Sequence, residues 1–315
     1  MNTQRIARHI AIAVSLLALS GGASGFDLGK FLEDSVNQEL NKSKNPQPAQ
    51  TTPATTPATQ QGAATPPPTK QKIDVNQLGF ALFGDYTPEQ ENRIGRQVSG
   101  DLLGAVPLVR DDKLQRYVNQ VGNWVALQSG SKDRVWHFGV LDTEDINAFA
   151  APGGYVFVTK GLYRRLNNEA DLAGVLGHEI AHVTQRHHLK VLKQSSLISA
   201  LGQVAGSKAK SSDQAVQNLI GNGAEMMARG LDKNAEFEAD RVGIVYAARA
   251  GYTPWGLPDV LQDLAGLPAQ DERTSLLYKT HPHPADRLAA LGETVGGQFD
   301  AVQGKDLASR FYRIR

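Results

Sequence analysis

The most constraining feature of this sequence is the pentapeptide His-Glu-Ile-Ala-His at residues 178–182. Apolar residues recur at steps of three and four through residues 172–183, which predicts an amphipathic helix. On that helix His178 and His182 project from one face, because they are four residues apart. Two neutral imidazoles side by side are the beginning of a tetrahedral zinc site. Glu179 lies about 100° around the helix from His178, so we expect it to act on a water at the zinc as a general base, without ligating the metal.

A zinc site needs a third protein ligand, and without one the pentapeptide is equally explained as part of a solvated helix face. The stretch Asn-Ala-Glu-Phe-Glu-Ala-Asp at residues 234–240 provides candidates. Glu236 and Asp240 are four apart on one face of a second predicted helix. Glu236 is the candidate third ligand. Asp240 is suited to accept the free N–H of a ligating imidazole and so to fix its tautomer. We interpret Glu238 as a solvated residue.

The combination of H-E-I-A-H with E-F-E-A-D resembles the HtpX and CAAX-prenyl-protease family of zinc metallopeptidases, which are gluzincins. Three more stretches match that family's pattern in the right order. They are N-A-F-A-A-P-G-G at residues 147–154, Y-V-F-V-T-K-G at residues 155–161, and Thr280-His-Pro followed by Arg287. The resemblance covers roughly residues 90–291. No stretch after the N-terminal segment approaches 18 consecutive apolar residues. In this respect the sequence resembles the soluble periplasmic branch of the family.

The resemblance implies an α+β fold that is mainly helical, a zincin-like metallopeptidase domain with a small sheet. Residues 155–159 are a strongly β-forming run, and in the family this strand borders the active-site cleft as an edge. The candidate substrate-binding residues are therefore Gly154, Tyr155, Val156 and Phe157. An exposed edge strand pairs with an extended peptide through backbone hydrogen bonds, so we expect weak side-chain specificity.

The resemblance also implies that His281 and Arg287 approach the zinc from the far side and donate hydrogen bonds to a tetrahedral oxyanion. Prolines at 282 and 284 hold His281 in an extended segment. A neutral imidazole there has a second possible role, as a fourth zinc ligand that shuts the enzyme off. Donation is the expected role, because Arg287 is placed to share it. His187 and His188 do not return to the ligand face of a continuous helix, so we predict that they are surface residues.

The N-terminus has the pattern of an export signal. Arg5 and Arg8 precede an apolar run at residues 10–19, too short to span a bilayer, and small residues follow it. Residues 1–25 are therefore predicted to be a cleaved signal peptide, which places the mature protein in the periplasm. The alternative is an uncleaved signal that anchors the chain in the inner membrane.

Composition divides the remaining chain into two parts. Residues 26–72 contain a possible short leader helix and a Pro-, Thr- and Ala-rich tether that cannot bury enough apolar surface to fold. Residues 73–315 are long enough for one metallopeptidase domain, and within it the small-residue stretch 195–230 is a candidate lid. The absence of cysteine is compatible with an exported protein whose core needs no disulfides. With 33 basic and 32 acidic residues, the charge gives no support for nucleic acid or anionic membranes as partners.

The sequence as a whole predicts an endopeptidase with one zinc ion per chain, which hydrolyses peptide bonds of unfolded or misassembled exported proteins. One alternative is a zinc-bearing chaperone or assembly factor that holds polypeptides without cutting them, and the intact Glu179 argues against it. Another is a structural zinc domain, which three identified ligands disfavour because structural sites usually have four.

Overall fold

The computed structural model describes residues 85–194, 231–268, 271–295 and 297–314, all within one compact unit, Thr69–Arg315. The predicted signal peptide, leader and tether lie outside these residues, as does the candidate lid at 195–230. The described part of the chain contains no helix long and apolar enough to cross a membrane. It is mainly helical with one small sheet, which confirms the predicted fold class.

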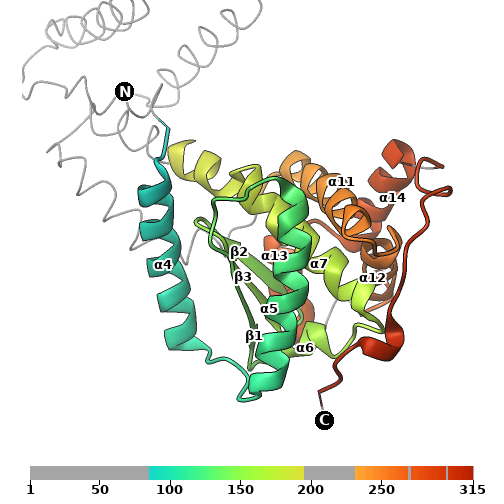
Figure 1. Cartoon of the computed structure of the whole chain (residues 1–315), viewed down its shortest axis with the longest axis horizontal. Helices are drawn as coiled ribbons and strands as arrows, with labels where there is room; N and C mark the ends of the chain where they lie inside the picture. Colours follow the sequence, from blue (N-terminus) through green and yellow to red (C-terminus); the bar gives the residue numbers. More distant parts are fainter. Residues whose placement is uncertain (1–84, 195–230, 269–270, 296, 315) are drawn as a thin grey trace, which may run out of the picture. The chain divides into compact units, whose positions relative to one another are not determined.

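The elements follow one another as shown in Figure 1. The helices are α4 (Pro88–Ala105), α5 (Asp112–Ala126), α6 (Lys160–Tyr163), α7 (Glu169–Thr184), α11 (Lys233–Arg249), α12 (Gly256–Ala265), α13 (Ser275–Thr280) and α14 (Pro284–Val295). The strands are β1 (His137–Leu141), β2 (Ala148–Ala151) and β3 (Tyr155–Thr159). Short 3-10 turns lie at Leu127–Ser129, Glu272–Thr274 and Ala308–Arg310.

The sheet has the strand order β1-β3-β2, with β3 parallel to β1 and antiparallel to β2. The prediction that Tyr155–Thr159 is the edge strand is therefore wrong: β3 is the central strand, and β2 is an edge. The reason lies in the turn before β3, where Gly153 and Gly154 have φ of 83° and 101°. These left-handed conformations, which glycine adopts without strain, fold β2 back onto β3, while β1 pairs with the other side of β3.

Helix α7 lies at the centre of the core and packs against α5, α11, α12 and β2. Asn168 caps it by accepting a hydrogen bond from the Asp171 amide, as the Asn-Asn pair before the helix predicts. Leu172, Leu176 and Ile180 are fully buried. Every residue from Glu169 to Val183 is buried, so the helix has no solvated face, and the histidines of the pentapeptide lie inside the protein.

Two glycines bring α7 and α11 close together. A Cβ on Gly177 would lie 2.6 Å from the carbonyl oxygen of Gly243, and one on Gly243 would lie 2.5 Å from the backbone nitrogen of His178. Both distances are too short for any side chain, so only glycine allows this approach. The close crossing is what brings side chains of α11 against the histidines of α7.

The chain turns sharply after α7. Gln185 and Arg186 form a turn, and residues 187–194 are helical again. Arg186 has φ of 57°, a left-handed conformation that costs a residue with a side chain about 1–2 kcal/mol. Its guanidinium pairs with Asp85 at 2.6 Å and Glu91 at 2.5 Å, and donates to the carbonyl of Tyr86 at 2.5 Å. These contacts fix the turn against the beginning of α4.

Candidate metal centre

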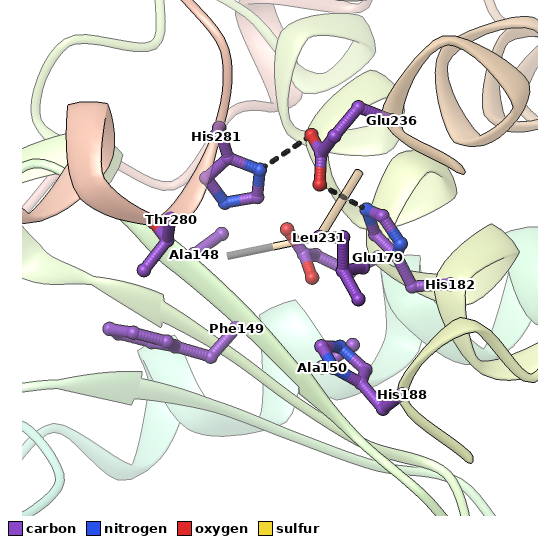
Figure 2. A pocket seen from close by; sticks show the side chains of 10 residues that line it. All are labelled: Ala148, Phe149, Ala150, Glu179, His182, His188, Leu231, Glu236, Thr280 and His281. Carbon is purple, nitrogen blue, oxygen red and sulfur yellow. Dashed lines mark hydrogen bonds and ion pairs between the residues drawn. The ribbon is translucent and has the colours of Figure 1, made fainter. Parts of the chain in front are cut away.

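Four side chains from three separate parts of the chain converge at one point. His178 and His182 come from α7, Glu236 from the first turn of α11, and His281 from the extended residues between α13 and α14. Each offers one ligand atom, and these atoms all lie within 4.8 Å of one another. The Nε2 atoms of His178 and His182 are 2.9 Å apart. Figure 2 shows Glu236 between His182 and His281. Its Oε1 lies 3.4 Å from His182 Nε2, and its Oε2 lies 2.8 Å from His281 Nδ1.

The residues present fit a metal ion. Glu236 Oε1 is buried and has no hydrogen-bond partner among the described residues. A carboxylate oxygen buried without a donor is costly, and a cation between the four side chains would remove that cost. Three imidazoles and one carboxylate are a donor set that suits zinc.

Coordination requires neutral imidazoles and an ionised carboxylate, and the charge states of His182 and Glu236 fit this requirement. Burial would raise the pKa of Glu236, but the neighbouring His281, His178 and Arg287 together lower it to about 2. Burial lowers the pKa of His182 well below its ordinary value. Burial also lowers the pKa of His281, but the negative charge and hydrogen bond of Glu236 more than offset this, so the net shift is upward.

Glu179 lies beside this group but outside it. It is 2% exposed, and burial raises the pKa of its carboxyl group. The pocket that it enters is lined on one side by the edge strand β2. The full lining, drawn in Figure 2, is Ala148, Phe149, Ala150, Glu179, His182, His188, Leu231, Glu236, Thr280 and His281.

Asp240 supports His178 from behind. Its Oδ1 is 2.8 Å from His178 Nδ1, so His178 presents Nε2 to the other ligand candidates. Arg287 in turn pairs with Asp240. Its Nε and Nη2 donate to the two oxygens of Asp240 at 2.9 and 2.5 Å, and it is not among the described residues that line the pocket. The contact between α11 and α14 directs this guanidinium to Asp240, and its Nη2 also lies 3.1 Å from Nδ1 and 3.5 Å from Nε2 of His178. The oxyanion role of Arg287 stays a prediction.

The predicted substrate-binding residues are also corrected. Gly154 is in the turn before the central strand, and Tyr155, Val156 and Phe157 are the first residues of that strand. Val156 and Phe157 are 0% and 5% exposed. The pocket is bordered instead by Ala148, Phe149 and Ala150 of β2. The sequence contained the signal for this, because residues 148–151 are the short strand before the Pro-Gly-Gly turn.

The prediction that His187 and His188 are surface residues is wrong. His187 is 2% exposed, its Nδ1 lies 2.9 Å from His182 Nδ1, and its Nε2 lies 3.3 Å from Glu238 Oε2. His188 lines the pocket. The prediction assumed a continuous helix, whereas the turn at Arg186 directs the chain back to His182. No glycine marks that turn, so helical periodicity gives no warning of it.

Comparison with known proteins agrees with this geometry. Residues 112–295 match peptidase family M48, more than half of the chain, and the protein belongs to that family. It is similar to the beta-barrel assembly-enhancing protease of Yersinia pestis, with 32% identity over 220 residues, which are 67% of this chain and 45% of that protein. It is also similar to the mitochondrial metalloendopeptidase OMA1 of Schizosaccharomyces pombe, at 27% over 214 residues, 67% of this chain and 63% of the relative.

A third relative is the metalloprotease YcaL of Escherichia coli strain K12, with 30% identity over 160 residues, 50% of this chain and 62% of that protein. The chain spans about half the length of the beta-barrel assembly-enhancing proteases that it matches. The family assignment that the sequence motifs predict is thus confirmed.

Proposed function

We propose that this protein is a zinc-dependent endopeptidase in which His178, His182 and Glu236 hold one zinc ion. The observation that carries the proposal is the buried Glu236 Oε1, which lacks a hydrogen-bond partner among the described residues and faces His182. Zinc at this point supplies Lewis acidity, which makes water a stronger acid and polarises a carbonyl group. Asp240 holds the Nδ1 proton of His178 and thereby keeps Nε2 available as a ligand atom.

Glu179 acts as the general base. Its buried carboxylate lies in the pocket between the ligand group and the strand β2, where it accepts a proton from the attacking water and passes it to the leaving amine. Membership of a peptidase family supports catalysis over the alternative of a zinc-bearing chaperone. His281 lies within the ligand group itself, and we assign it to the fourth ligand position in the resting enzyme.

Substrate binds along β2. Thr159 donates its N–H to the carbonyl of Asn147 at 3.0 Å. Along an antiparallel pair, the backbone N–H and C=O groups of successive residues point alternately towards the partner strand and away from it. The N–H and C=O of Ala150 therefore point away from β3. An extended peptide pairs with these groups as an added strand. Recognition of backbone suits substrates that are unfolded rather than substrates of one sequence.

The substrates that we propose are unfolded or misassembled exported proteins in the periplasm. Two observations support this: the N-terminal pattern of an export signal, and the similarity to proteins named beta-barrel assembly-enhancing proteases. Residues 1–25 are the proposed signal peptide, residues 26–72 the proposed leader and tether, and residues 73–315 the proposed metallopeptidase domain.

The test compares wild type with Glu179→Gln, which removes the base but no proposed ligand. We expect one zinc per chain in both proteins by elemental analysis, and loss of casein cleavage by at least ~100-fold in the variant, the usual scale for a lost general base. Cleavage by Glu179→Gln at the wild-type rate would contradict the mechanism. A zinc-loaded wild type that binds unfolded casein without cutting it would indicate the chaperone instead.

A further inference from the structure

Each of the two helical zinc ligands has a different partner on its outer nitrogen. His178 Nδ1 meets the carboxylate of Asp240, which is itself paired with Arg287. His182 Nδ1 meets a second imidazole, His187 Nδ1, at 2.9 Å. Beyond it, His187 Nε2 lies 3.3 Å from Glu238 Oε2. His178 is thus supported by the ion pair of Asp240 with Arg287. His182 is supported by the imidazole of His187, which in turn contacts the carboxylate of Glu238.

The hydrogen bonds alone determine where the protons lie in the row of side chains His182, His187 and Glu238. His182 presents Nε2 to the other ligand candidates, so in its neutral form the proton is on Nδ1. The contact of 2.9 Å with His187 then requires His187 Nδ1 to accept. In a neutral ring the remaining proton of His187 is on Nε2, where it is donated to Glu238. Each ring nitrogen of His182 and His187 is thus assigned as either a donor or an acceptor, without conflict.

We infer that His187 is a positioning residue for the zinc site: its Nδ1 accepts the Nδ1 proton of His182, and Glu238 fixes His187 in the tautomer that can accept. The inference rests on the proposed zinc site and assigns a role to a residue that does not itself touch zinc or substrate. Partners of this kind orient a ligating imidazole and raise its basicity, and their loss typically lowers metal affinity or activity by about 10–100-fold.

The backbone is built to deliver His187 to this place. On an uninterrupted helix a residue five positions after His182 would lie about 140° away from it. The left-handed turn at Arg186 directs His187 back to its neighbour, and the ring is 2% exposed. Arg186 is held in that conformation by Asp85, Tyr86 and Glu91. An imidazole buried in this way, with both nitrogens engaged, is fixed in one orientation.

The experiment uses three substitutions. His187→Leu removes the acceptor and keeps an apolar side chain. His187→Asn keeps an acceptor, because the amide oxygen of Asn takes the place of histidine Nδ1. His137→Leu is the matched control, since His137 is an exposed histidine on β1, away from the described metal-ligand group. Zinc affinity of the full-length protein is measured by competition with a chromophoric chelator, and the cobalt-substituted protein reports ligand geometry in its visible spectrum.

We expect the zinc dissociation constant to rise about 10–100-fold in His187→Leu, to recover most of that loss in His187→Asn, and to stay at the wild-type value in His137→Leu. The visible spectrum of cobalt should change in His187→Leu, whereas the melting temperature of the zinc-free protein should not. Wild-type zinc affinity in His187→Leu, or an affinity in His187→Asn as low as in His187→Leu, would overturn the inference.

Should His187→Leu fail to fold, Glu238→Ala decides the question, because this side chain is 41% exposed and its loss leaves no cavity. Weaker zinc binding in Glu238→Ala supports the inference, and unchanged binding overturns it. A wild-type protein that binds no zinc would instead overturn the proposed function, so the two failures are distinguishable.

Discussion

At the scale of single residues, His281 decides whether the metal centre has an open position. Its Nδ1 lies 2.8 Å from Glu236 Oε2, and it belongs to the group of four converging ligand candidates. A catalytic zinc site keeps one position free for water or substrate. The sequence favours oxyanion donation because Arg287 was expected to share it, but Arg287 is paired with Asp240. The geometry therefore favours the role of His281 as a reversible fourth ligand.

This role predicts that His281→Ala increases activity. If the open form is about a tenth of the resting population, removing the competing ligand raises the turnover of casein by up to about tenfold. Steady-state cleavage by wild type and variant at equal zinc content measures this. A fall in turnover of ~10²–10³, the scale of one lost oxyanion contact, would establish donation instead.

At the scale of elements, the edge strand β2 determines how a substrate can approach. By the alternation of the β2–β3 ladder, the N–H of Ala150 points away from β3 and that of Phe149 points towards it. Proline is compatible with an edge strand only where the missing N–H faces outward. Proline at Ala150 should therefore affect peptide binding, whereas proline at Phe149 should affect the stability of the sheet.

We expect Ala150→Pro to lower kcat/KM for casein by about 2- to 13-fold, because one backbone hydrogen bond to the substrate, worth about 0.5–1.5 kcal/mol, is lost. Zinc content should be unchanged. Phe149→Pro is the matched control, and we expect it to lower the melting temperature because it breaks the ladder to β3. The proposed binding mode would be incorrect if Ala150→Pro cleaved casein as wild type does.

At the scale of the whole molecule, the metal proposed here would join segments that lie far apart in the chain. The candidate ligands come from α7, from α11 and from the residues before α14. A metal that binds only the folded state stabilises it by about 2.7 kcal/mol at a free concentration 100 times its dissociation constant. A zinc ion bound by these residues would therefore contribute to the stability of this fold as well as to its chemistry.

Removal of zinc by a chelator should lower the melting temperature by roughly 5–10 °C, since about 1 kcal/mol corresponds to 2–4 °C in a domain of this size. Glu236→Ala should lose this response, and Glu272→Ala, an exposed glutamate away from the described ligand group, should retain it. Scanning calorimetry with and without chelator measures both. An unchanged zinc response in Glu236→Ala would exclude Glu236 as a ligand.

A second feature at this scale is Glu169, a fully buried carboxylate at the start of α7. It accepts hydrogen bonds from Tyr117 at 2.8 Å, from Tyr252 at 2.7 Å and from Arg310. Burial raises the pKa of Glu169, but the donors together bring it below its ordinary value. One carboxylate thus connects α7 with α5, with the segment before α12 and with the C-terminal residues.

The lowered pKa means that the unfolded chain binds the proton more tightly, so the stabilisation is present at neutral pH and is lost as pH falls through the folded-state pKa. We expect Glu169→Gln to reduce the free energy of unfolding by about 1.5–3 kcal/mol at pH 7, the scale of hydrogen bonds to a charged group. The difference from wild type should shrink below pH ~4. Urea titrations at several pH values test this, and a difference independent of pH would show that the charge is unimportant.

Features that depend on local spacing could be predicted from the order of residues alone. The i, i+4 pairs of His178 with His182 and of Glu236 with Asp240 place side chains on one face of a helix wherever that helix lies. The caps at Asn168 and at Thr87 likewise depend only on hydrogen bonds between residues close in sequence. The family and the mainly helical fold class followed from these motifs.

Three features became visible only in the folded chain: β2 is the edge strand, Arg287 pairs with Asp240, and His187 returns to His182. Each depends on contacts between segments that are distant in sequence. β1 pairs with β3, α14 packs against α11, and Arg186 is held in a left-handed turn by residues 85–91. Periodicity describes one element at a time. It carries no information about a turn that depends on a partner elsewhere in the chain, and that is why the contact of His187 with His182 was visible only in the folded protein.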